Sequence, residues 1–305
     1  MSRIHDALKR AEQERAASMG THVDTSAQPL EPSPVDMPNL QGTGVPGMST
    51  GSGLSWEALL ARCPQSEWTP DADHMLFFQD DETRIGTEEF RTLRSRLYQI
   101  REKMPLKRIL VTSAMPREGK SFVASNLTQV MVRQHGRRAL LIDGDLRNPG
   151  LHKNFGAQLS PGLSDYLLGE CDEFAIMQRG PMENLCFVAA GRVVPSAPEL
   201  LANGRLKLFL QRVEPLFDWI IIDSSPVIPV SDPTVVAGNC DGVLMVVRSE
   251  ITSSELAKRA REEFPDKLLL GVVLNGTIGR FSQARYYYGE AISPYVSHYL
   301  RPYRK

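Results

Sequence analysis

The 305-residue sequence contains few cysteines, and they lie far from one another. Cys63, Cys171, Cys186 and Cys240 form no C-x-x-C pair. Zinc sites and disulfide frameworks both depend on characteristic cysteine spacings. The sequence therefore predicts neither, and this cysteine usage favours a cytoplasmic location.

Long apolar runs and an excess of one charge are missing as well. No apolar run reaches the roughly 20 residues of a membrane-spanning helix, so we expect no direct membrane span and attachment only through a partner or a surface helix. The 35 Lys and Arg residues balance 36 Asp and Glu residues, for a net charge of -1. Because this balance lacks the basic footprint of nucleic-acid-binding proteins, no nucleic acid partner is expected.

The first residues carry a narrow apolar stripe. Ile4, Leu8 and Ala11 recur at helical spacing among charged residues, which predicts an amphipathic helix over 1–18. The stripe has no large aromatic residue to anchor it in a membrane surface. The helix therefore either covers part of its own domain or docks to a partner.

The next residues, 19–75, are rich in Pro, Gly, Ser and Thr and show no hydrophobic period. This composition is typical of a disordered tether, in which residues 56–62 form one island with helical potential. Regular patterning begins near residue 76. Residues 76–279 are interpreted as one folded domain and residues 280–305 as a separate tail.

The stretch from Arg108 to Leu127 combines a buried strand, a tight loop and a helix that opens on the loop. In such a loop, main-chain N–H groups and the helix N-terminus bind phosphate oxygens, Lys120 reaches the outer phosphates, and Ser121 offers a hydroxyl to Mg²⁺. Ala114 stands where the G-x-x-x-x-G-K-[ST] pattern has its first Gly, which requires a negative φ there.

The alternative is a chance Gly-Lys-Ser before an ordinary amphipathic helix, which the strand-loop-helix context disfavours. The loop predicts a nucleotide site made by Met115, Pro116, Arg117, Glu118, Gly119, Lys120, Ser121 and Phe122.

Acids follow two further predicted strands. Residues 138–143 form a run without alternation, typical of a parallel strand covered on both faces, and lead into Asp143 and Asp145. Residues 218–223 end in Asp223, the pattern of an acid that holds Mg²⁺. Loop caps are an alternative role for either of the first two acids. A helix is predicted over 198–213, before the strand that ends in Asp223, and later strands over 242–247 and 268–275 are separated by a helix over 252–264. This alternation of strands and helices predicts an α/β, doubly wound, mostly parallel sheet.

A helix predicted to begin near Thr87 carries Glu88, Arg91 and Arg94 on one stripe. In isolation such a stripe is usually a solvated face with weak ion pairs.

The tail holds six of the eight tyrosines of the chain. They could stack on single-stranded nucleic acid, pack as a C-terminal cap, or accept phosphate. Each phosphate adds about -1.5 to -2 charges, so full modification would invert the basic charge of the tail. The candidate acceptors are Tyr286, Tyr287, Tyr288, Tyr295, Tyr299 and Tyr303.

This order of motifs resembles the bacterial tyrosine kinase (BY-kinase) family, the cytoplasmic autokinases of capsule and exopolysaccharide production. The motifs are the atypical phosphate loop, the segment 141–147 with its two acids, the segment 220–226 and the tyrosine cluster. Residues 1–13 are similar to the start of the exosortase-associated subgroup. Two departures stand out: Ser224-Ser225 where many relatives carry Thr-Pro, and Arg117 where relatives often have Gly.

The resemblance implies an ATP- and Mg²⁺-dependent P-loop NTPase fold of the MinD/ParA-like type. Lys120 would bind the transferring phosphate, and Asp143 would orient or deprotonate the incoming tyrosine. Ser121, Asp145 and Asp223 would hold or position the metal. By analogy with related ATPases, Asn275 would contact adenine.

The resemblance further implies that Glu88, Arg91 and Arg94 close a ring of subunits. The expected partner is a transmembrane chain-length-determinant or activator protein of a polysaccharide export system, which would recruit the kinase to the inner face of the membrane.

Of three possible functions, a structural or nucleic-acid-binding module with a decayed P-loop is disfavoured because all three acids and the Lys-Ser pair are present, and two remain. The first is an ATP-dependent protein-tyrosine autokinase that phosphorylates its tail in trans. The alternative is a MinD/ParA-type switch ATPase without kinase activity. That class carries a second lysine early in the loop, where this sequence has Met115, and it gives no reason for the tail tyrosines.

Overall fold

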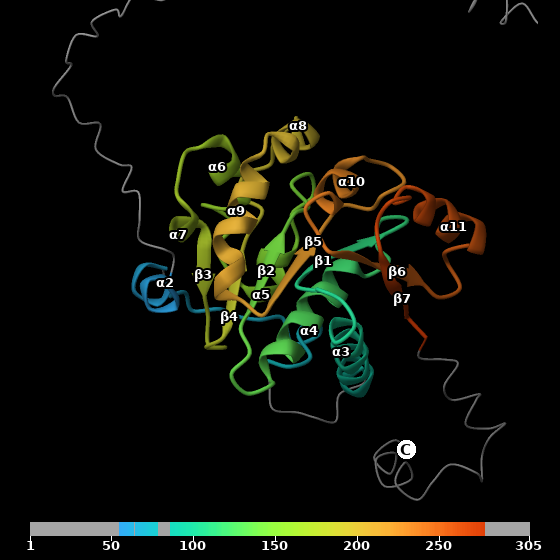
Figure 1. The fold of residues 1–305 in the computed structure, drawn as a ribbon, viewed down its shortest axis with the longest axis horizontal. Helices are drawn as coiled ribbons and strands as arrows, with labels where there is room; N and C mark the ends of the chain where they lie inside the picture. Colours follow the sequence, from blue (N-terminus) through green and yellow to red (C-terminus); the bar gives the residue numbers. More distant parts are fainter. Residues whose placement is uncertain (1–54, 64, 79–85, 278–305) are drawn as a thin grey trace, which may run out of the picture. The chain divides into compact units, whose positions relative to one another are not determined.

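The computed structural model describes residues 55–63, 65–78 and 86–277, all of them within one compact unit (Figure 1). The predicted N-terminal helix, the first part of the tether and the six tail tyrosines lie outside the described residues.

A seven-stranded sheet organises the fold, in the order β3-β4-β2-β5-β1-β6-β7. All neighbours pair in parallel except β3 and β4. The predicted doubly wound, mostly parallel sheet is therefore confirmed. The strands are β1 (Arg108–Ser113), β2 (Ala139–Asp143), β3 (Met177–Arg179), β4 (Leu185–Val188), β5 (Trp219–Asp223), β6 (Gly242–Arg248) and β7 (Leu269–Asn275).

Helices cover both faces of the sheet, as Figure 1 shows with α3 and α4 on one side and α8 to α10 on the other. The helices are α2 (Trp56–Arg62), α3 (Thr87–Arg101), α4 (Lys120–Val132), α5 (Leu151–Phe155), α6 (Leu163–Leu168), α7 (Glu173–Ile176), α8 (Ala197–Ala202), α9 (Arg205–Val213), α10 (Asp232–Ala237) and α11 (Ser254–Glu262).

The unbroken apolar character of the central strands follows from this double cover. In β1, Ile109 and Val111 pack into the core under α3 and α4, while Leu110 between them packs into the core on the other face. Since successive side chains of a strand point to opposite faces, a strand with two buried faces needs apolar residues at every position. The strand β1, which leads into the phosphate loop, is thus packed on both of its faces.

Residues 65–78, which we call the strap, correct the predicted domain boundary. The sequence analysis assigned them, up to residue 75, to the disordered tether, yet Trp68 and Met75 are buried. The side chain of Asn126 on α4 fixes the strap by accepting the N–H of Leu76 at 2.8 Å and donating to the carbonyl of His74 at 2.9 Å. These hydrogen bonds join residues 50 and 52 positions apart and follow no hydrophobic period. The sequence pattern therefore could not predict that the strap is folded.

Two other differences lie between β2 and β5. The single helix predicted over 198–213 is two helices, because Gly204 adopts a left-handed φ of 84° between α8 and α9. The short edge strand β3 was not predicted. With three residues, of which Met177 and Gln178 are buried, it is too short to show a period.

Candidate active site

The phosphate loop connects β1 to α4, as predicted. Its positive φ angles fall at Arg117 (66°) and Gly119 (98°), while Ala114 has the negative φ that its replacement of Gly requires. The first hydrogen bond within α4 runs from the Val123 N–H to the Gly119 carbonyl at 2.9 Å. The preceding N–H groups, at residues 120–122, have no acceptor within the helix and form its positive end, where an anion is stabilised.

Two of the predicted acids face each other across neighbouring strands. Asp143 of β2 is in register with Asp223 of β5 at the carboxyl end of the sheet. Gly144 follows Asp143 so closely along β5 that an added Cβ would lie 2.7 Å from the carbonyl oxygen of Asp223. Only glycine fits between the two acids at this distance, because a backbone atom cannot move aside as a flexible side chain can.

Lys120 lies among these acids. Its Nζ is 3.0 Å from Asp145 Oδ2 and 4.0 Å from Asp223 Oδ2, and it donates to Ser121 Oγ at 3.2 Å. The Asp143 carboxylate is oriented by main-chain N–H groups, accepting from Asp145 at 3.2 Å and from Leu151 at 3.2 Å. The structure therefore brings together the predicted lysine, serine and all three acids.

Burial and crowding of like charges shape the protonation of this cluster. Burial, with the neighbouring carboxylates of Asp223 and Asp145, raises the pKa of Asp143 to about 7. Burial also raises the pKa of Asp223, to about 6, against the opposing effect of Lys120. For Lys120 itself burial lowers the pKa, but Asp223 and Asp145 outweigh it, so the net shift is upward.

The residues present fit a magnesium ion. The buried Asp223 Oδ1 has no hydrogen-bond partner within the described part of the chain, and the surrounding donors are carboxylate and hydroxyl oxygens. Mg²⁺ prefers such oxygen ligands and usually keeps several waters and substrate phosphates. No group of three His, Cys, Asp or Glu side chains in the described ranges is arranged to hold a metal ion by itself.

Ser225 is a site residue that the sequence analysis did not assign. Its hydroxyl donates to Asp145 Oδ1 at 2.8 Å, and the Asn148 N–H donates to the same oxygen at 3.1 Å. The other oxygen of Asp145 remains directed at Lys120. The sequence offered two signals for Ser225: its position two residues after Asp223, and the departure of Ser224-Ser225 from the Thr-Pro of many relatives.

Other predicted nucleotide-site residues have different surroundings. Met115, Pro116 and Arg117 are exposed on the loop. The ring of Phe122 packs edge to face against Phe90 of α3, with centroids 5.8 Å apart, so only its main chain belongs to the phosphate site. Asn275 donates to the carbonyl of Glu118 at 2.9 Å, and its contact with adenine stays a prediction.

The predicted stripe of Glu88, Arg91 and Arg94 on α3 makes contacts within the chain. Glu88 and Arg91 form an ion pair at 2.5 Å. Arg94 instead donates to the carbonyl of Val130 at 2.9 Å and so ties α3 to α4. The role of this stripe between subunits stays a prediction.

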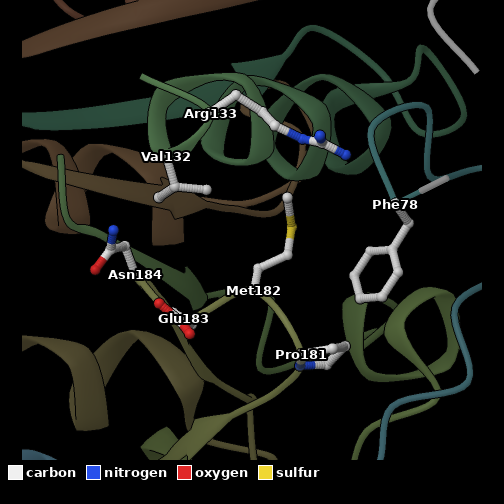
Figure 2. A pocket seen from close by; sticks show the side chains of 7 residues that line it. All are labelled: Phe78, Val132, Arg133, Pro181, Met182, Glu183 and Asn184. Carbon is white, nitrogen blue, oxygen red and sulfur yellow. The ribbon is translucent and has the colours of Figure 1, made fainter. Parts of the chain in front are cut away.

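A cavity of about 330 Å³ lies at the other end of α4 from the phosphate loop. Figure 2 shows the Met182 side chain between Val132 of α4 and Phe78 of the strap. Since α4 has 13 residues, its two ends are about 20 Å apart. The cavity is therefore separate from the lysine and the acids.

A phosphate loop, a lysine and three acids at the carboxyl edge of a parallel sheet define a P-loop nucleotide-binding protein. None of the helices in the described ranges is both long enough and apolar enough to cross a membrane. No protein-family model matches the chain.

Comparison with known protein sequences shows which family of P-loop proteins the chain resembles. The chain is 31% identical over 206 residues to tyrosine-protein kinase YwqD of Bacillus subtilis, covering 67% of the chain and 86% of YwqD. It is 29% identical over 218 residues to the putative tyrosine-protein kinase CapB of Staphylococcus aureus, covering 70% and 95%. For tyrosine-protein kinase etk of Escherichia coli, 32% identical over 210 residues, the match covers 68% of the chain but only 29% of that longer protein.

Solved structures agree with these relatives. The chimerical protein CapA2B2 has a TM-score of 0.62 at 28% identity, covering 67% of this chain and 90% of that one. The kinase domain of the Escherichia coli tyrosine kinase ETK has a TM-score of 0.58 at 30% identity, covering 62% and 74%. The chain belongs to the bacterial tyrosine-protein kinase family and is a protein-tyrosine kinase.

Proposed function

We propose that the chain is an ATP-dependent autokinase that phosphorylates the C-terminal tyrosines of a neighbouring copy. The observation that supports this most directly is the position of Lys120, 3.0 Å from Asp145 and 4.0 Å from Asp223, where the phosphate loop opens at the carboxyl edge of the sheet. Phosphoryl transfer depends chiefly on positioning and on neutralising charge, and this cluster provides both.

The residues of the site take distinct parts in the transfer. Lys120 and the N–H groups at the start of α4 bind the phosphates of ATP, and Asp143 receives the proton of the attacking tyrosine hydroxyl. A bond forms between the tyrosine oxygen and the γ-phosphorus. The bond from the γ-phosphorus to the β–γ bridging oxygen breaks, and ADP leaves with that electron pair. Ser121, Asp145 and Asp223 would hold Mg²⁺, which neutralises phosphate charge when bound.

The tail and the α3 stripe extend the proposal to an assembly. Glu88, Arg91 and Arg94 close a ring in which each tail reaches the next active site. Accumulated phosphate then loosens the ring, because each one adds about -1.5 to -2 charges. In the cell, a transmembrane activator recruits this cytoplasmic kinase to the inner face of the membrane and couples it to exopolysaccharide or capsule production and export.

Phosphotyrosine mapping by mass spectrometry tests the reaction. The full chain is incubated with ATP, Mg²⁺ and membranes from source cells that lack the wild-type chain, so that no active copy is present to phosphorylate the variants. We expect Lys120→Met and Asp143→Asn to lower phosphotyrosine at least about 100-fold, the effect of removing one transition-state contact. Lys207→Met and Asp266→Asn change exposed residues of the same types and should retain it. Wild type without phosphotyrosine, or Lys120→Met with it, would refute the proposal.

Transfer between copies has its own test. An inactive Lys120→Met chain with an intact tail is mixed with an active chain whose six tail tyrosines are replaced by Phe. Phosphotyrosine on the inactive chain demonstrates transfer in trans. Its absence, when wild type alone is phosphorylated, rejects the trans part of the proposal.

The switch ATPase shares the fold and the phosphate loop. It predicts ATP hydrolysis and nucleotide-dependent dimers without phosphotyrosine. Membership of the tyrosine-kinase family favours the autokinase over this alternative.

A further inference from the structure

The carboxylate of Glu118 is buried within the phosphate loop itself. The residue is only 2% exposed, although its neighbour Arg117 is exposed. Its Oε2 accepts the N–H of Met115 at 2.6 Å, and its Oε1 accepts the hydroxyl of Thr252. Both oxygens are therefore bonded to the protein, one to the loop and one to a distant segment.

The segment that provides Thr252 is the connection between β6 and α11, residues 249–253. The Thr252 hydroxyl oxygen also accepts the Arg248 N–H at 3.3 Å, which fixes it to the end of β6. The Ser249 N–H donates to the carbonyl of Asn275 at 2.8 Å. The connection and the end of β7 are thus joined, and together they form a support beside the loop.

This support contacts the loop at two points. Thr252 donates to the Glu118 side chain, and Asn275 donates to the Glu118 carbonyl at 2.9 Å. Both hydrogen bonds converge on one residue. The conformation of the loop around Glu118 is consequently set by residues more than 130 positions further along the chain.

Arg117 shows what this anchoring maintains. Its φ of 66° is left-handed, a conformation unfavourable for a residue with a Cβ. Arg117 lies inside the turn that the Glu118 carboxylate closes by accepting the Met115 N–H. Without that acceptor, the turn can relax to a negative φ at Arg117, which redirects the N–H groups that follow.

We propose that Glu118 is a positioning residue: through Met115 and Thr252 it holds the phosphate loop in its binding conformation before the nucleotide arrives. It does not touch the phosphates itself. Because the loop is ordered during folding and not on binding, nucleotide affinity rises. The inference rests on the nucleotide site of the proposed function but not on which hydroxyl receives the phosphate.

The experiment measures the equilibrium affinity of the full chain for fluorescent ADP, with KM for ATP and kcat alongside. We expect Glu118→Ala to weaken ADP binding about 10- to 100-fold, the effect of losing hydrogen bonds to a charged group. KM should rise more than kcat falls. Glu118→Gln should bind within about threefold of wild type, since its amide can accept from Met115 and donate to Thr252.

Thr252 provides a second pair of variants, which keeps the test open if Glu118→Ala fails to fold. Thr252→Val removes the hydroxyl with little change in shape and should weaken ADP binding about tenfold, while Thr252→Ser should retain it. Equal affinities for the Val and Ser variants would count against the proposal.

The double variant Glu118→Ala with Arg117→Gly tests whether Glu118 acts by holding Arg117 at its positive φ. Glycine adopts positive φ without penalty, so it needs the anchor less. We expect the loss caused by Glu118→Ala to shrink at least about threefold in the Arg117→Gly background. The same loss in both backgrounds, wild-type affinity in Glu118→Ala, or a Glu118→Gln variant as weak as Glu118→Ala would overturn the proposal. Wild type that binds ADP but makes no phosphotyrosine would instead refute the proposed function alone.

Discussion

Gly119, the last residue of the phosphate loop, should tolerate no side chain. Its φ is 98°, and an added Cβ would lie 2.0 Å from the amide nitrogen of Asn275. In Gly119→Ala the left-handed backbone costs about 1–2 kcal/mol. Asn275 must also turn away and lose its hydrogen bond to Glu118, about 1 kcal/mol more. The sum of about 2–3 kcal/mol corresponds to a fall in Tm of about 8 °C for a domain of this size.

Two variants separate these costs. Gly136 has a φ of 71° with no atom within 4 Å of an added Cβ, so Gly136→Ala carries only the backbone cost and a fall in Tm of about 4 °C. Asn275→Ala removes the obstructing amide, since only the Asn275 Cβ, 4.0 Å away, would remain near the new methyl. Added to Gly119→Ala, it should therefore lower stability no further, although alone it costs about 1 kcal/mol.

Thermal unfolding of the nucleotide-free chain, followed by circular dichroism, measures these shifts. ADP affinity, measured in parallel, should fall for Gly119→Ala and stay unchanged for Gly136→Ala, which lies beyond the other end of α4. Equal Tm shifts for the two glycine variants would show that the contact with Asn275 contributes nothing. An Asn275→Ala effect that adds in full to Gly119→Ala would show that the amide is not the obstacle.

Three further predictions concern other contacts. Mg-ATP at 100 times the wild-type Kd should stabilise wild type by about 2.7 kcal/mol in a thermal-shift assay. The same concentration should stabilise Asp223→Asn by far less, because the variant binds Mg-ATP more weakly. Without nucleotide Asp223→Asn should be the more stable protein, because burial disfavours the charged Asp223 carboxylate more than Lys120 favours it, and a lower Tm would contradict this. Arg147→Ala should cost about 2–3 kcal/mol in urea unfolding, since it leaves Asp232, fully buried, without its cation. The half-exposed pair of Arg137 with Asp218 is the control, and Arg137→Ala should cost less than about 1 kcal/mol. Asn126→Ala should destabilise the chain by about 2–3 kcal/mol and open the strap to limited proteolysis. Asn203→Ala also removes two side-chain hydrogen bonds, but at an exposed residue away from the strap, so it should cost less and leave the strap protected from the protease.

The sequence by itself determined the parts of this protein that depend on local order. An apolar run without alternation predicts a parallel strand buried on both faces, and the strands containing Ile109, Leu141 and Ile221 are such strands. The carboxyl ends of parallel strands meet at one edge, so Lys120 and the acids that follow these strands had to converge.

Tertiary structure alone decided how that site is supported. Ser225 orients Asp145, Thr252 and Asn275 hold Glu118, and Asn126 fixes the strap, and each contact joins residues at least 50 positions apart. Such hydrogen bonds leave no period in the sequence, because a polar side chain has the same local pattern whether it meets water or a distant main-chain group. Only the packed chain shows which polar groups meet.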